Sequence, residues 1–82
     1  GPDCWIGPGA VIGDDVVVGA RCEIHPGVVI GAGSKLGNDV TLYPHAVLYA
    51  ETIVDDRAII HAGAVLGADG FGYKFVQGAF EK

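Results

Sequence analysis

The sequence contains no methionine, only two cysteines and no run of about 18 consecutive apolar residues. The missing apolar run argues against a membrane-spanning helix, although the mean hydropathy is positive at +0.40. Two cysteines do not make a disulfide framework, and no CxxC pair is present to hold zinc. We therefore expect a protein of the reducing cytoplasm, with no metal and no cofactor.

Positive charge is also scarce, since five lysines and arginines face ten aspartates and glutamates and leave a net charge of −5. A nucleic-acid groove needs an excess of basic side chains, so we expect no nucleic-acid partner. The 82 residues suffice for one domain at most, with a limited core.

What the sequence does contain is a repeat of six residues. The first residue of each repeat is aliphatic, eleven times in succession, at Ile6, Ile12, Val18, Ile24, Ile30, Leu36, Leu42, Leu48, Val54, Ile60 and Leu66. The next residue is glycine in six of the eleven repeats, and the residue four positions after the aliphatic one is nearly always small. A period of six matches neither a helix nor a long alternating strand. It predicts short strands separated by turns, where glycine relieves backbone strain at the corner.

Three such repeats, 18 residues in all, would close one triangular coil. Successive coils would then pair in parallel at a rise of roughly 4.8 Å, as hexapeptide repeats do in β-helices. The pattern resembles that of left-handed parallel β-helices, which are an exception to the right-handed crossover rule. We therefore predict an all-β fold, a left-handed parallel β-helix of about four triangular coils over residues 1–71. A β-sandwich with fortuitous spacing is the alternative.

Residues 18 positions apart should stack in columns along the coils. Asp3, Arg21, Asp39 and Arg57 alternate in charge and should form an ion ladder on one corner. The columns on the walls carry a second prediction, because Val11, Val29, Val47 and Val65 should form an outward stripe. Four exposed valines in a row indicate a covered surface, most simply a subunit interface, or else a bare β-branched face.

The two cysteines, Cys4 and Cys22, should share an inward column with Val40 and Ala58. Their spacing would permit a disulfide, although small buried thiols fit the core better.

The repeat has recognisable limits. Gly1 already falls in phase, so we expect a segment excised from a longer chain. The frame breaks at Gly72, where an aliphatic residue is due. We therefore expect residues 72–82 to begin an extruded, aromatic-rich loop.

The run GADGFGY, residues 67–73, resembles the point where a loop interrupts the coils in UDP-3-O-acylglucosamine N-acyltransferases of lipid A synthesis. Residues 36–65 also resemble the coils before that loop. The resemblance implies a homotrimeric enzyme that moves a 3-hydroxyacyl group from acyl carrier protein to the 2-amine of a UDP-linked glucosamine. In that family a histidine beyond the equivalent of Lys82 is the general base, which suits imidazole because its pKa lies near the working pH.

Several parts of that family are not found in this sequence, namely its Ala-His-Asn motif, its N-terminal uridine-binding domain and its C-terminal helices. We therefore expect the 82-residue chain itself to be inactive. His61 and His45 are the catalytic candidates within it. Asp69, Gly70, Phe71 and Tyr73 are the candidate substrate-binding residues of this loop. The glycines could instead simply permit the turn out of the coil, and the aromatics could pack on the helix wall.

The three histidines belong to one corner. His25 and His61 should lie two coils apart with Tyr43 between them, and His45 two positions beyond Tyr43. Two coils separate their rings by roughly 9–10 Å, too far to share one metal. They could be solvent-exposed corner residues, contacts for substrate or acyl chain near a subunit interface, or metal ligands across a trimer interface. The last possibility would fit a γ-type carbonic anhydrase-like trimeric zinc enzyme. A purely structural β-helix scaffold is the other alternative.

Overall fold

The computed structural model describes residues 3–67 and the backbone of residues 74–75. These residues form short parallel strands in three sheets, and the described part contains no helix. The strands are β1 (Trp5–Ile6), β2 (Val11–Ile12), β3 (Val17–Val18), β4 (Glu23–Ile24), β5 (Val29–Ile30), β6 (Lys35–Leu36), β7 (Thr41–Leu42), β8 (Val47–Leu48), β9 (Ile53–Val54), β10 (Ile59–Ile60), β11 (Val65–Leu66) and β12 (Lys74–Phe75).

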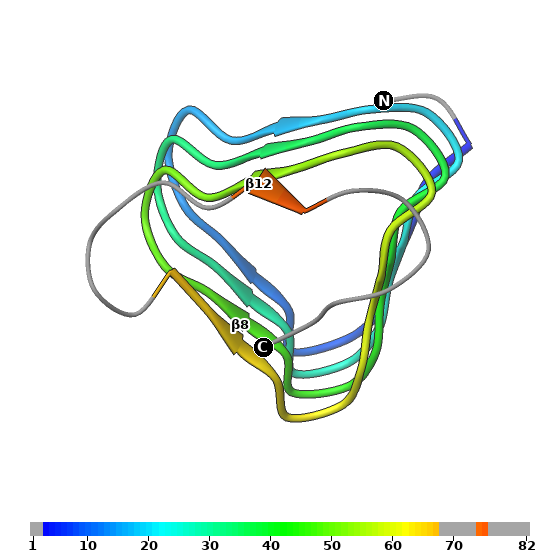
Figure 1. The fold of residues 1–82 in the computed structure, drawn as a ribbon. Helices are drawn as coiled ribbons and strands as arrows, with labels where there is room; N and C mark the ends of the chain where they lie inside the picture. Colours follow the sequence, from blue (N-terminus) through cyan, green and yellow to red (C-terminus); the bar gives the residue numbers. More distant parts are fainter. Residues whose placement is uncertain (1–2, 68–73, 76–82) are drawn as a thin grey trace.

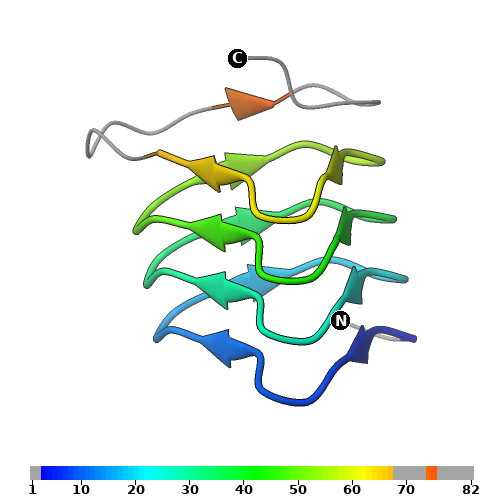
Figure 2. The same cartoon turned by 90° about the horizontal axis from the view of Figure 1, so that it is seen from below.

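Each sheet is one wall of a triangular coil (Figure 1). The strand orders are β1-β4-β7-β10, β2-β5-β8-β11 and β3-β6-β9-β12, so every third strand returns to the same wall. Seen from the side, the coils lie flat on one another (Figure 2). The chain winds as a left-handed parallel β-helix, which confirms the predicted fold class.

The register between coils is 18 residues throughout the first eleven strands. Ile6 pairs with Ile24, Ile24 with Leu42, and Leu42 with Ile60. Backbone N–H groups of one coil donate to carbonyls of the next, for example Gly7 N to Ile24 O at 2.7 Å. A strand of two residues cannot satisfy its own backbone, so this bonding between coils holds the fold together.

The core consists of three columns of aliphatic residues, one on each wall, together with the small residues at the turns. From Ile24 onward every repeated aliphatic residue is at most 3% exposed. The small side chains that face inward from the corners include two hydroxyls, Ser34 and Thr52. Both donate to the carbonyl of Tyr49, at 3.0 Å and 2.8 Å respectively. These buried polar groups are therefore satisfied.

The first coil differs from the rest in its burial. Ile6 is 51% exposed and Ile12 is 37% exposed, whereas Ile24 and Ile30, their neighbours in the next coil, are at most 1% exposed. The cause is position, because β1, β2 and β3 each stand at the end of a sheet. Their inward side chains pack against the second coil on one side only.

The structure corrects the reason we gave for the repeated glycines. Positive φ angles occur at the third residue after the aliphatic one, at Gly27 for instance, and not at Gly7, Gly13, Gly19, Gly31 or Gly37. Those five glycines are needed for close approach. A Cβ on Gly37 would lie 2.7 Å from the backbone nitrogen of Asp56 in the next coil, inside van der Waals contact. Gly67, with φ of 76°, is the one such glycine with a left-handed backbone.

Strand β12 continues the third sheet by pairing Lys74 with Ile53 and Phe75 with Val54. A strict 18-residue register would place this strand at residues 71–72, so it lies three residues late. Residues 68–73 and 76–82 lie outside the described residues, so the expected boundary between residues 71 and 72 stays a prediction. Within the described residues, no helix has the length and apolarity needed to cross a membrane.

Candidate functional site

The candidate site lies where the turns after β1, β4, β7 and β10 stack on one another, at the lowest corner in Figure 1. We call His25, Tyr43, His45 and His61 of these turns the histidine corner. The turns are closed by bonds across three residues, such as Ala46 N to Tyr43 O at 3.2 Å. Their central residues are Pro-Gly, Pro-His or, after β10, Ala-Gly, and the positive φ at the second of these positions is typical of type II turns.

The rings of this corner form a continuous column. The centroids of His25 and Tyr43 are 5.1 Å apart, and those of Tyr43 and His61 are 6.2 Å apart with nearly parallel planes. The predicted position of Tyr43 between the two imidazoles is thereby confirmed. Because the phenol ring separates them, His25 and His61 of one chain do not share a metal ion. Among the described residues, no group of three or more His, Cys, Asp or Glu side chains could hold one.

His25 is the most enclosed member of the column. The edge of Trp5 lies against it, with ring centroids 5.2 Å apart, and its Nε2 atom is buried. Glu23 Oε1 is 3.4 Å from Nε2, which is ion-pair range for a protonated imidazole, but the contact lacks hydrogen-bond geometry. His25 Nε2 therefore has a neighbouring carboxylate but no hydrogen bond. Sequence reasoning missed both partners, although Glu23 is two residues before His25 and Trp5 is 18 before Glu23.

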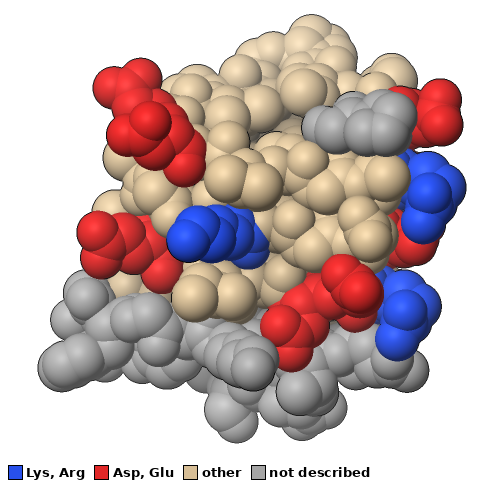
Figure 3. All heavy atoms as spheres, turned by 90° about the horizontal axis from the view of Figure 1, so that it is seen from above, with Lys and Arg blue, Asp and Glu red and all other residues tan. Residues whose placement is uncertain are grey.

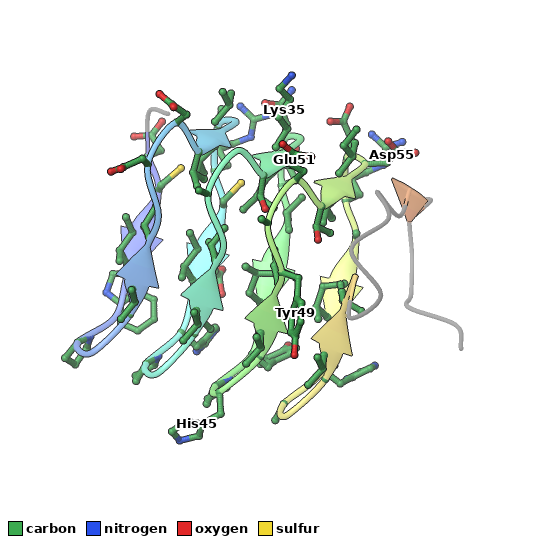
Figure 4. The ribbon with its side chains drawn as sticks, turned by 90° about the vertical axis from the view of Figure 1, so that its left-hand side faces the viewer. Lys35, His45, Tyr49, Glu51 and Asp55 are labelled. Carbon is green, nitrogen blue, oxygen red and sulfur yellow. The ribbon has the colours of Figure 1, made fainter. Side chains whose placement is uncertain are left out.

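His45 projects from the corner (Figure 4) and is exposed. Its backbone has φ of 66°, in the left-handed region where Gly9, Gly27 and Gly63 stand in the other coils. Its imidazole lies over Gly27, since a Cβ there would come within 2.5 Å of His45 Nδ1. His61 is likewise exposed. Exposure fits the reading of corner residues in solvent, and the catalytic roles suggested for His45 and His61 stay predictions.

A second surface is formed by Val11, Val29, Val47 and Val65, which we call the valine face. They pair in sequence along β2, β5, β8 and β11, as predicted. Val11, Val29 and Val65 are exposed large hydrophobic residues, while Val47 is half-buried. Tyr49, at the corner after β8, is also exposed beside this face (Figure 4). A row of apolar side chains in water favours a covered surface.

The ion ladder occupies the corner between the first and third sheets. Arg21 donates from Nε to Asp39 Oδ1 at 2.8 Å and from a terminal nitrogen to Oδ2 at 3.0 Å. These bonds hold the pKa of Asp39 below its usual range and raise that of the Arg21 guanidinium. Asp3 adds a smaller electrostatic contribution to the pKa of Arg21, and Arg57 adds one to the pKa of Asp39. The Arg21–Asp39 step of the predicted ladder is therefore confirmed, and acidic and basic side chains gather along one edge in Figure 3.

The same corner carries a second ladder that sequence reasoning missed. Asn38 Oδ1 accepts from Ala20 N at 2.8 Å, and Asp56 Oδ1 accepts from Asn38 N at 2.8 Å. These side-chain oxygens satisfy backbone groups that face outward at the turn, so they have a structural role. The substrate-binding residues implied by the resemblance, Asp69, Gly70, Phe71 and Tyr73, lie outside the described residues.

Comparison with protein families matches the family described as bacterial transferase hexapeptide (six repeats) to residues 1–32 and 33–68. Comparison with curated proteins and with solved structures gave no match. The family model covers nearly the whole β-helix, and its repeat is the one that builds the three walls. The chain belongs to the bacterial transferase hexapeptide family.

Proposed function

We propose that this chain is the coil segment of an acyltransferase, in which it serves as a rigid scaffold and a subunit-contact surface. The observation that carries this proposal is the exposed valine face on a regular hexapeptide β-helix. Monomeric proteins rarely leave a long apolar stripe in water, because burial of each exposed aliphatic side chain stabilises an assembly by about 1 kcal/mol or more. Three copies meeting through one wall each would form a closed homotrimer.

The substrates of the proposed enzyme follow from the resemblance of residues 67–73. They are UDP-3-O-acylglucosamine and a 3-hydroxyacyl acyl carrier protein, in the lipid A pathway of the cytoplasm. The 2-amine of the sugar attacks the thioester carbonyl, a base takes the amine proton, and the carrier thiol leaves. No metal and no cofactor enters this reaction.

We place the base outside this chain. The ring of His25 packs against Trp5 and Tyr43, and its Nε2 atom is buried, so that a substrate in solution could not reach it. His45 and His61 are exposed at the turns. A general base needs to be held within hydrogen-bond reach of the proton that it abstracts, which an imidazole in open solvent is not. In this proposal the 82-residue chain by itself is inactive.

An acyl-transfer assay tests the proposal. The chain and the longer enzyme that would contain it are each given UDP-3-O-acylglucosamine and 3-hydroxyacyl carrier protein, and the product is read by mass spectrometry. We expect the longer enzyme to form product and the 82-residue chain to form none. Product from the 82-residue chain that disappears in His61→Ala or His45→Ala would place the base in these coils, and an inactive longer enzyme would exclude this reaction.

The subunit contact is tested separately by sedimentation equilibrium. We expect the wild-type chain to sediment as a trimer and Val29→Glu, in the middle of the valine face, to sediment as a monomer. Lys35→Glu changes a charge on another wall and is the matched control, expected to stay trimeric. A wild-type chain that stays monomeric at high concentration would show that the valine face alone does not assemble the coils.

A further inference from the structure

We propose that Cys4 and Cys22 are a site of reversible thiol–disulfide exchange, which takes a small-molecule disulfide such as oxidised glutathione and yields a disulfide between the first two coils. The two residues occupy the same inward column, as predicted. In the structure both are reduced thiols, Cys4 half-buried and Cys22 buried. Neither has a role in the function proposed above.

The geometry brings the two sulfurs to one place. Cys4 Sγ donates to the carbonyl of Gly19 at 3.0 Å, and Cys22 Sγ lies 3.7 Å from the same oxygen. The backbone nitrogen of Cys22 donates to Cys4 Sγ at 3.4 Å. The two sulfurs therefore lie around one carbonyl on adjacent coils, and Cys22 Sγ also donates to the carbonyl of Gly37 in the next coil at 3.2 Å.

The backbone separation also suits a disulfide. Cys4 and Cys22 each precede a residue of the pair Trp5 and Glu23, so they stand opposite each other on neighbouring parallel coils. Neighbouring strands lie about 4.8 Å apart. Disulfides form between Cα atoms roughly 4.4–6.8 Å apart, so the bridge needs no large backbone movement.

Another corner of the molecule has the same packing arrangement with hydroxyls in place of thiols. Ser34 and Thr52 hold the equivalent relation at another corner, and they also direct their side chains at one shared carbonyl, that of Tyr49. A hydrogen-bonding side chain at this position therefore has a packing role by itself. Two hydroxyls could fill that packing role at positions 4 and 22 as well. Only a pair of cysteines can also form a covalent disulfide bond there.

The two thiols differ in access. Cys4 is half-buried in the first coil, whereas Cys22 is 0% exposed. Cys22 is covered by the first coil, and its burial raises the pKa of its thiol. We therefore assign the first attack to Cys4 and the second to Cys22.

The exchange runs in two steps that balance. The Cys4 thiolate attacks one sulfur of oxidised glutathione, forms a mixed disulfide and releases one glutathione thiolate. The Cys22 thiol then loses its proton to solvent, attacks Cys4 Sγ and releases the second glutathione. Two protein thiols are oxidised to one disulfide, and one glutathione disulfide is reduced to two thiols.

The disulfide joins the first coil, whose inward side chains are the most exposed, to the second coil, whose inward side chains are buried. The bridge closes a loop of 18 residues, for which the loss of chain entropy in the opened state corresponds to about a 100-fold shift of the opening equilibrium. Opening of the first coil would thus depend on the redox state of the solution.

The test treats the reduced chain with oxidised glutathione, blocks remaining thiols with iodoacetamide and digests with trypsin, which cleaves after Arg21 and Lys35. We expect a chain lighter by two hydrogen atoms, with residues 1–21 linked to residues 22–35, no iodoacetamide on either cysteine, and reversal by dithiothreitol. Amide exchange in the first coil should slow about 100-fold. A lasting glutathione adduct on Cys4, a covalent dimer, or two unreacted thiols would each overturn the proposal.

The matched variants are Cys22→Ala and Ser34→Ala. Cys22→Ala keeps the core, since Ala58 fills the same column two coils later, and it should stop at the glutathione adduct on Cys4. Ser34→Ala disturbs the equivalent packing site and should leave the exchange intact. If Cys22→Ala fails to fold, the mass and peptide map of the wild-type chain still decide the proposal.

Discussion

The burial gradient along the aliphatic column makes a quantitative prediction. Leu42, in the third coil, is 0% exposed, whereas Ile6, in the same column of the first coil, is 51% exposed. Leu42→Ala should lower the free energy of unfolding by about 2–5 kcal/mol, because it removes buried methyl groups and leaves a closed cavity. Ile6→Ala removes a side chain of the same size but leaves no closed cavity. Because the Ile6 side chain is already half exposed in the folded state, its burial contributes only about half of the full transfer free energy. We expect it to cost about 1 kcal/mol.

This difference is large against the whole stability of the chain. A domain of this length is stable by roughly 4–12 kcal/mol, so Leu42→Ala should remove a large fraction of it. The measurement is urea denaturation followed by circular dichroism, with the midpoints of both variants compared with wild type. A cost for Ile6→Ala equal to that for Leu42→Ala would refute the reasoning, and would mean that the first coil is covered in solution. Ile24→Ala, at the residue paired with Ile6 in the second coil, is the control and should match Leu42→Ala.

Three further predictions concern the turns and the ladders. Ser34→Ala should cost about 1–3 kcal/mol because it leaves a buried N–H of Thr52 unpaired. Thr52→Val should cost less, since it removes only the bond from the Thr52 hydroxyl to the Tyr49 carbonyl and leaves both bonds of Ser34 in place; denaturation midpoints of the two variants decide their order. Gly37→Ala should destabilise the fold by several kcal/mol through backbone overlap with the next coil, and a melting temperature equal to wild type would contradict the close approach. The lowered pKa of Asp39 predicts stability that is present above about pH 4 and is lost as the pH falls through the folded-state pKa; Arg21→Gln should flatten this pH dependence of the melting temperature, and high salt should reduce it.

The sequence was sufficient to predict the coils because their geometry repeats every 18 residues. Once a coil is 18 residues long, the partners of Ile24 or Val29 follow by counting, and the columns were predicted correctly for that reason. The repeated glycines show what the period alone does not predict. Their position was predicted, but the reason was wrong, since the distance from Gly37 to Asp56 depends on how closely coils approach at the corner.

The surroundings of the histidines could be predicted only in part. The column of His25, Tyr43 and His61 follows from the period, but the edge contact of Trp5 does not. Trp5 lies on a wall, and its ring reaches the corner through a side-chain rotamer that no repeat specifies. The three-residue delay of β12 is likewise a local departure from the period, which pairing with β9 alone reveals.

The constant register also determines which insertions the fold can accept. Adding 18 residues within the coils would lengthen the prism by about 4.8 Å and leave every column in place. Adding six would keep all aliphatic residues inside, yet every face beyond the insertion would turn by one wall, and the valine face would be cut in two. The core would tolerate such a change while the assembly would not. In this fold, the interior constrains length in steps of six and the surface in steps of 18, so surface function is the stricter selection on the length of the chain.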